Sequence, residues 1–305
     1  MKRYLFLMAA TACMLSCAGN GDSGNGVELL DAAAFRTEID GKPVGLYTLQ
    51  NADGMTVQLT NYGARVVALW VPAADGRFRD VVWGYDSIDA YLRTADKYCG
   101  PVVGRFGNRI GKGRFTLDGK EYRLAVNNGP NHLHGGTKNF ANRLWESRVE
   151  TNRVVMSLLS EDGDQNYPGE LNVEAVFDFD DDNALEITYL AKTDKTTVVN
   201  LTNHVYFNLA GDGSGSILDH ELRLNSSKVL EMNDKQIPTG KLLDAAGTPQ
   251  DFRQFRPFRP GIGSEFNHIR DFKGYDHPFV IDGWQPNILG EVGELREKSS
   301  GRCVK

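Results

Sequence analysis

Apolar and polar side chains alternate at every second position in several stretches of this 305-residue chain. Residues 55–60 and 172–179 show the pattern over at least three repeats. Because successive side chains of a β-strand point to opposite faces, this period predicts half-buried strands rather than helices. A polar turn at residues 180–183, followed by renewed alternation over residues 185–191, predicts a β-hairpin.

The same period recurs along most of the chain, which favours one large β fold. A second hairpin is predicted around Asp118-Gly119, a dipeptide that tolerates the positive φ values of a tight turn. Residues 87–95 alone read as a short helix, and no change in composition after residue 27 marks a domain boundary. Further strands are expected at residues 65–71, 80–83, 154–159, 197–209 and 221–230. The predicted fold class is therefore all-β, a large antiparallel β-sandwich.

Composition excludes several classes of protein. With 41% apolar and 24% charged residues, the chain resembles an ordinary globular protein rather than a disordered or fibrous one. The 34 basic residues are outnumbered by 40 acidic ones, which gives a net charge of -6 and opposes binding to nucleic acid.

The first residues have the pattern of an export signal. Lys2 and Arg3 precede a mostly apolar stretch at residues 4–15, and small residues follow it. Twelve residues cover about 18 Å as a helix, which is too short to span a bilayer core of about 30 Å. We therefore expect residues 1–16 to be a cleaved signal peptide.

Cys17 lies where the apolar stretch ends, and residues 14–17 resemble the bacterial lipobox, in which the cysteine is lipidated. We expect Cys17 to carry the lipid, residues 17–34 to form a flexible tether and residues 35–305 to form the folded domain. An ordinary secretory signal with an incidental cysteine is the alternative. Export to the periplasm or the outer membrane as a lipoprotein follows, with the lipid as the only membrane contact.

Two cysteines, Cys99 and Cys303, remain outside this segment. Two distant cysteines do not form a disulfide framework, although they could pair in an oxidising compartment. We expect both to be buried free thiols.

The six histidines are concentrated in stretches rich in Asn and Gly. His132 and His134 flank Leu133, so an extended backbone would project both to one side. In residues 201–209 the even positions are expected to share one polar strand face. Those positions are Thr202, His204, Tyr206 and Asn208. Such a face suits a polyhydroxylated ligand such as a sugar, although a face that merely meets water would have the same pattern.

Several ordered motifs resemble those of the aldose 1-epimerase (galactose mutarotase) family from about Thr48 onwards. They are residues 103–110, 132–136, 201–211 and 274–277, with weaker matches at 118–122, 167–171 and 237–240. The resemblance implies the galactose mutarotase-like β-supersandwich. It also implies interconversion of the α and β anomers of free hexoses such as galactose and glucose, without a metal or organic cofactor.

The resemblance also implies residue roles. His204 would be the general acid that protonates the ring oxygen, which suits an imidazole because its usual pKa is about 6.5. The positions that would bind the sugar are Asn108, Arg109, His134, Tyr206 and Asp276. The guanidinium of Arg109 and the carboxylate of Asp276 can each hold more than one hydroxyl.

One element of the family pattern is not found in residues 1–305. The resemblance implies a glutamate base in a segment well beyond the Asp276-His277 motif. Residues 292–305 read instead as a strand, a turn and the start of a returning strand. We therefore expect the C-terminal strands and the base to be missing and the activity of this chain to be impaired. Nothing in the sequence assigns the role to Glu291, Glu294 or Glu297.

Two other functions fit parts of the pattern. The first is a non-catalytic lipoprotein that binds sugar through the same residues. The second is a zinc enzyme with His132, His134 and His204 as ligands, since three histidines on a β scaffold can hold zinc. For the chain as a whole we expect a monomer that has a small-molecule sugar and no nucleic acid as its partner.

Overall fold

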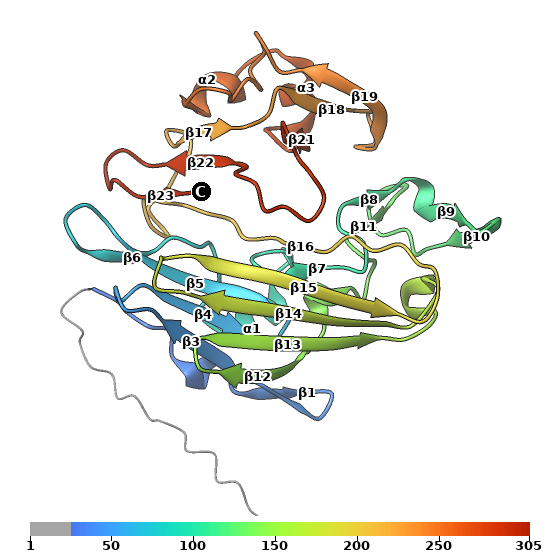
Figure 1. Ribbon diagram of the computed structural model, residues 1–305, viewed down its shortest axis with the longest axis horizontal. Coiled ribbons are helices and arrows are strands. Elements are labelled where there is room, and N and C mark those ends of the chain that lie inside the picture. Colours follow the sequence, from blue (N-terminus) through green and yellow to red (C-terminus); the bar gives the residue numbers. More distant parts are fainter. Residues whose placement is uncertain (1–25) are drawn as a thin grey trace, which may run out of the picture.

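The computed structural model describes residues 26–305, and two four-stranded antiparallel sheets form its core (Figure 1). The first sheet contains β3 (Leu46–Gln50), β4 (Thr56–Thr60), β5 (Arg65–Pro72) and β6 (Phe78–Asp80). The second contains β12 (Glu146–Glu150), β13 (Arg153–Ser160), β14 (Leu171–Phe179) and β15 (Leu185–Thr193). Apolar side chains of both sheets belong to one buried cluster, so the predicted β-sandwich is confirmed.

Burial in the two sheets follows the sequence period to different degrees. Along β14, buried and more exposed residues alternate, and the apolar side chains face the core, as predicted. Every residue of β4 is buried, including Gln58, so the expected half-buried strand is wrong there. The backbone N–H of Leu30 donates to the Gln58 side chain, because the N-terminal segment covers the second face of this sheet. Helix α1 (Ile88–Arg93) contributes to a second apolar cluster with η1 (Ala32–Phe35).

Both predicted hairpins are present. β14 and β15 pair over nine residues, and β9 (Arg114–Leu117) pairs with β10 (Lys120–Arg123). Asp118 and Gly119 connect β9 to β10 with φ values of 50° and 75°. These values suit the mirror-image turn that joins twisted strands.

Three expected strands differ from the structure. In the expected strand at residues 197–209, only β16 (Thr202–Asn203) is regular, and it pairs with β7 (Val102–Val103). The strand expected at residues 80–83 ends at Asp80, whose carboxylate accepts from the N–H groups of Leu69 and Val82. The stretch at residues 221–230 contains two strands, β17 (Glu221–Leu224) and β18 (Lys228–Met232).

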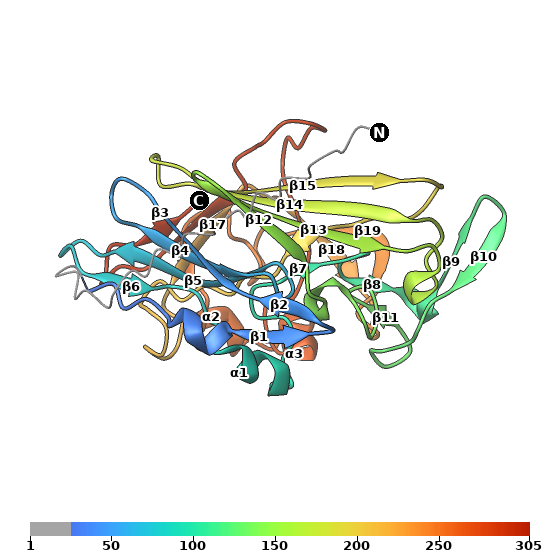
Figure 2. The same ribbon diagram turned by 90° about the horizontal axis from the view of Figure 1, so that it is seen from below.

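The last third of the chain adds two smaller sheets beside the sandwich (Figures 1 and 2). β17 pairs with β20 (Arg256–Pro257) and with β22 (Gly293–Arg296), and β22 also pairs with β23 (Cys303–Val304). β18 lies between β19 (Pro238–Asp244) and β21 (Phe279–Val280). Two short helices, α2 (Arg259–Ile262) and α3 (Asn267–Phe272), precede β21. No helix within residues 26–305 is long and apolar enough to cross a bilayer.

The N-terminal boundary and the cysteines need correction. Val27 and Leu30 pack against the apolar clusters, so the part of the expected tether between residues 27 and 34 lies on the domain. β1 (Thr37–Ile39) and β2 (Lys42–Val44) follow it. Cys99 is buried and Cys303 is exposed, both as free thiols. The expected signal peptide and Cys17 lie outside the described residues.

Candidate active site

The candidate active site contains two residues with a left-handed backbone conformation, Asn108 and His134. They hydrogen-bond to each other. They adjoin β8 (Arg109–Ile110) and β11 (His132–Leu133), which pair with each other. The Asn108 N–H donates to Nδ1 of His134 at 2.9 Å, and the His134 N–H donates to the Asn108 carbonyl at 3.0 Å. Gly135 follows with a φ of 86°, and a Cβ there would overlap the Gly104 carbonyl oxygen. Glycine is therefore required beside the histidine.

The bond from Asn108 sets the protonation state of His134. Nδ1 accepts a hydrogen bond, so a neutral imidazole must carry its proton on Nε2. Burial, and then the positive charges that His204 and Arg109 can carry, lower the pKa of His134 to about 4. At neutral pH the ring is therefore an uncharged Nε2–H donor.

His204 lies against three other aromatic rings. Its ring centroid is 5.4 Å from that of His134, with the two planes nearly perpendicular at 88°. The ring of Tyr206 is 5.0 Å away and that of Tyr98 is 5.7 Å away. The backbone N–H of His204 donates to Pro101 at 2.9 Å, which fixes the chain to the segment before β7. The imidazole nitrogens make no hydrogen bond to another residue within the described range, so they are available to a ligand.

Charged groups complete the site beside the two histidines. Arg109 is half-buried, and its Nε donates to the side-chain oxygen of Asn128 at 3.0 Å. Burial lowers the pKa of Arg109, and the nearby Asp276 carboxylate opposes that shift. Burial raises the pKa of Tyr206 to about 12, and the charges that Asp96, Cys99 and Asp276 can carry add to the shift. Asp276 is an exposed residue before β21, and its charge acts on both Arg109 and Tyr206.

The structure thus brings together six residues that the sequence analysis selected. They are Asn108, Arg109, His134, His204, Tyr206 and Asp276. They come from the β8–β11 region, from the irregular chain after β16 and from the segment before β21. The site therefore depends on contacts between segments that are far apart in the sequence.

His132 does not join them, which corrects the expected common side of His132 and His134. His132 is fully buried, and its Nδ1–H donates to the Ala125 carbonyl at 2.7 Å. Its Nε2 accepts from the hydroxyl of Tyr167 at 2.7 Å. His134 leaves the extended conformation with a φ of 52°, so the two rings separate. The three histidines of the zinc alternative are therefore not brought together, and residues 26–305 contain no other group of ligands suited to a metal.

The expected polar face of residues 201–209 is also only partly present. His204 and Tyr206 remain in contact, but Asn208 is buried and its side chain accepts from the N–H of Ala210. The hydroxyl of Thr202 donates to the backbone of Asn203. Only Thr202 and Asn203 of this segment pair with another strand. After Asn203 the backbone is irregular, so side chains no longer alternate between two faces.

Sequence reasoning missed two aromatic residues of the site. Tyr98 has its ring centroid 4.7 Å from that of His134, and its hydroxyl accepts from Nδ2 of the buried Asn139 at 3.1 Å. The Trp83 ring lies 5.5 Å from that of Tyr206. Neither residue belongs to a recurring spacing, so no local signal in the sequence identifies them.

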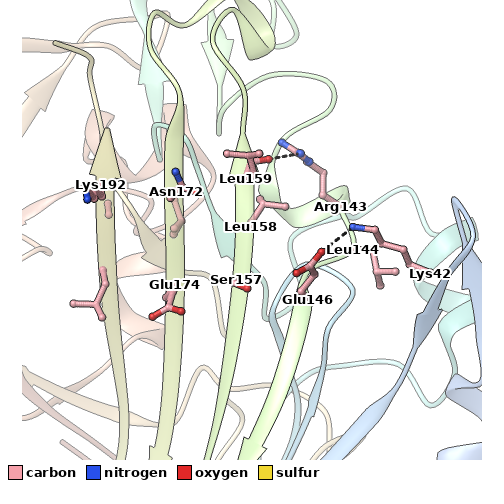
Figure 3. Close-up of a pocket in the computed structure, with 13 residues that line it drawn as sticks. Lys42, Arg143, Leu144, Glu146, Ser157, Leu158, Leu159, Asn172, Glu174 and Lys192 are labelled. Carbon is pink, nitrogen blue, oxygen red and sulfur yellow. Dashed lines mark hydrogen bonds and ion pairs between the residues drawn. The ribbon is translucent and has the colours of Figure 1, made fainter. Parts of the chain in front are cut away.

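A separate hollow lies across β12–β15, on the face opposite the core (Figure 3). Its volume is about 690 Å³. Lys42 pairs with Glu146, and Arg143 donates to the Leu159 carbonyl. No histidine lines this hollow, and its cations Lys42 and Arg143 already have carboxylate partners, so we assign the candidate chemistry to the His134–His204 site.

Comparison with known proteins agrees with this assignment. Residues 45–305 match the family model described as aldose 1-epimerase. Galactose mutarotase of Bos taurus is 44% identical over 269 residues, which cover 86% of this chain and 75% of the bovine protein. Aldose 1-epimerase of Escherichia coli K12 is 39% identical over 265 residues, 85% of this chain and 75% of the relative.

A solved structure leads to the same family. The crystal structure of galactose 1-epimerase from Lactobacillus acidophilus NCFM superposes with a TM-score of 0.75 at 29% identity. The match covers 86% of this chain and 76% of that one. This chain thus spans about three quarters of the length of these relatives.

Proposed function

Because this chain belongs to the aldose 1-epimerase family of isomerases, we propose that it interconverts the α and β anomers of free hexoses at the His134–His204 site. The observation that carries the proposal is the perpendicular contact of the two imidazoles, 5.4 Å apart, beside Arg109 and Asp276. Imidazole, guanidinium and carboxylate groups together offer the donors and acceptors that a sugar requires when it loses its water.

In the proposed reaction, His204 gives a proton to the ring oxygen while the bond from that oxygen to C1 breaks. A base removes the proton of the anomeric hydroxyl, and C1 becomes an aldehyde carbon. Rotation about the C1–C2 bond and the reverse proton transfers close the ring as the other anomer. Neutral His134 donates its Nε2–H to the sugar without adding a second positive charge to the site.

Arg109, Asn108, Tyr206 and Asp276 would bind the sugar rather than transfer protons. The guanidinium of Arg109 keeps its charge at all working pH values, and the Asn128 bond restricts its orientation. Asp276 is exposed and can accept from two adjacent hydroxyls.

We propose no base among the last glutamates of the chain, because each has a partner elsewhere. Glu291 pairs with Arg223, and Glu294 lies 3.9 Å from Lys305. Burial would raise the pKa of Glu297, but hydrogen bonds from Ser300 and Ser299 lower it to about 2. We expect residues 1–305 by themselves to bind hexoses and to accelerate mutarotation only weakly, since a missing general base costs about 10²- to 10⁴-fold in rate.

Polarimetry of freshly dissolved α-D-galactose and α-D-glucose tests both parts of this proposal. A small acceleration that disappears in His204→Gln supports an impaired epimerase. A full enzymatic rate would contradict the impairment, and sugar binding in calorimetry without any acceleration would favour the non-catalytic binding protein.

We also propose that the protein is an exported monomeric lipoprotein anchored through Cys17, in the periplasm or the outer membrane. The support is the order of the basic residues, the apolar stretch and the cysteine within residues 2–17. Labelling of cells with a fatty acid tests the anchor, because Cys17→Ser should lose the label. Light scattering of the purified protein tests the monomer.

A further inference from the structure

A groove of about 710 Å³ is connected to Arg109 through Asn128, which lines the groove and accepts a hydrogen bond from Nε of Arg109. Residues 128–131, residues 231–236, Thr239 and α3 line it, and we call it the amide groove. The two walls are joined by a hydrogen bond of 2.8 Å from Nδ2 of Asn131 to the Lys235 carbonyl. In Figure 1 these walls are the region around β8 and β11 and the β18–β19 hairpin with α3.

Uncharged polar groups dominate the lining. Five amide side chains contribute to it: Asn128, Asn131, Asn233, Gln236 and Asn267. The three carboxylates of the lining already have partners. Asp234 pairs with Lys235, Asp271 with Arg270, and Glu231 with Lys241. Such a lining suits a neutral ligand with many hydroxyls rather than a metal ion or a phosphate.

A pair of histidines at the back of the groove lacks the partners that buried polar groups normally have. His268 lines the groove and is 8% exposed, and its Nδ1 has no hydrogen-bond partner within the described residues. His277 stacks on it at 4.9 Å with the ring planes 8° apart, and neither nitrogen of His277 has a partner there. Buried polar groups without a partner are costly, which points to a ligand or solvent that satisfies His268.

The groove adjoins the candidate active site at two points. Asn128 lines the groove and accepts from Arg109 through its side-chain oxygen, at 3.0 Å. His277, which stacks on His268, directly follows Asp276 in the chain. A ligand bound to Asn128 in the amide groove would therefore be one residue away from Arg109 of the active site.

We infer that the amide groove is a second binding site for a sugar unit, held by its amide side chains and by His268. The choice of ligand rests on the proposed function. The sugar unit has two possible sources, a free hexose or the non-reducing unit of a reducing disaccharide whose other unit occupies the His134–His204 site.

NMR titration of the full chain separates these sources. We would follow the side-chain amides of Asn128 and Gln236 for the groove, and the backbone amide of Tyr206 for the active site, with D-galactose and then with lactose. Groove signals that shift with galactose at their own midpoint indicate a free hexose. Groove signals that shift only with lactose, in step with Tyr206, indicate a disaccharide. Unshifted groove signals with both sugars would overturn the inference.

Two variants of one exposed residue provide the matched pair. Thr239→Trp should fill the groove and weaken the groove response at least tenfold. Thr239→Val removes the hydroxyl that donates to Glu231 and accepts from the Lys241 N–H, but it leaves the groove open and should retain the response. His268→Leu replaces the imidazole by an apolar side chain of similar size and should also weaken the groove response at least tenfold. An undiminished groove response in both Thr239→Trp and His268→Leu would overturn the inference.

The NMR shifts and the mutarotation rate test the second sugar site and the proposed function separately. Shifts at Tyr206 and accelerated mutarotation without any groove response would refute the second site alone. A groove response without either of the other two signals would refute the proposed function alone.

Discussion

Two pairs of histidine rings are in contact within the described residues, and their geometry differs. His134 and His204 meet with perpendicular rings at the candidate active site, whereas His268 and His277 stack in parallel behind the amide groove. The backbone of Asn108 bonds to one nitrogen of His134 and so fixes which nitrogen carries the proton. No described residue hydrogen-bonds to either nitrogen of His277, so its tautomer is not fixed in this way.

The comparison teaches that burial alone does not make a histidine useful for acid–base chemistry. Burial lowers the pKa of both His134 and His277 to about 4, so both are neutral at pH 7. What distinguishes the active-site pair is a defined tautomer beside a second imidazole with free nitrogens.

Replacing His204 should have the largest effect on the reaction. His204→Gln removes the proposed proton donor, and we expect the weak acceleration of mutarotation by this chain to fall at least about tenfold, to the spontaneous rate. Polarimetry measures the loss, and thermal unfolding serves as the control because the imidazole makes no hydrogen bond within the described residues. Retained activity in a folded His204→Gln protein would exclude His204 as the acid.

The low pKa values of His134 and His277 should make the fold sensitive to acid. Burial is the main cause for both, with the second imidazole of each pair adding to it. Below pH 6.5 the unfolded chain binds protons that the folded chain does not bind, so the free energy of unfolding falls as the pH decreases towards 4. Each histidine should account for about 1–3 kcal/mol of that loss.

Urea denaturation at pH 7.0 and pH 4.5 measures this loss. His277→Leu removes one of these groups, so the difference between the two pH values should shrink by about 1–3 kcal/mol. An unchanged difference would mean that His277 is already protonated in the folded protein, or bonded to a partner that keeps its pKa near the ordinary value.

The regular part of the fold was predictable because its causes are local. Residues 171–193 form a hairpin with one face on the core, and both features follow from the period of two. The strand predicted at residues 197–209 was wrong, because hydrogen bonds to the carbonyls of Pro101 and Val81 position His204 and Asn208. No local pattern in the sequence encodes these contacts. The resemblance selected six residues that the structure brings together, although Tyr98 and Asn128 are recognisable only through their contacts in space.

His132 extends the histidine comparison, because both of its nitrogens have partners. Tyr167→Phe would leave Nε2 of the buried His132 unpaired, much as the nitrogens of His277 are. We expect a loss of about 1–3 kcal/mol in the free energy of unfolding, with little change in kcat/KM. Tyr189→Phe is the matched control, since the buried Tyr189 hydroxyl has no partner within residues 26–305 and its removal should cost nothing. Equal losses in both variants would contradict a specific role for the Tyr167–His132 bond.

The smallest expected effect concerns Tyr98, whose ring packs against both imidazoles of the active-site pair. Tyr98→Phe keeps the ring but loses the bond from Asn139, so the ring should hold His134 and His204 less firmly. We expect a loss of about 0.5–1.5 kcal/mol in stability and a decrease of less than about tenfold in kcat/KM. Tyr85→Phe loses a comparable bond to Thr94 elsewhere in the fold and should lower stability without slowing mutarotation. If both variants kept the wild-type rate, the geometry of the pair would be set by the Asn108–His134 bonds and the backbone of His204, and the Tyr98 ring would only fill space.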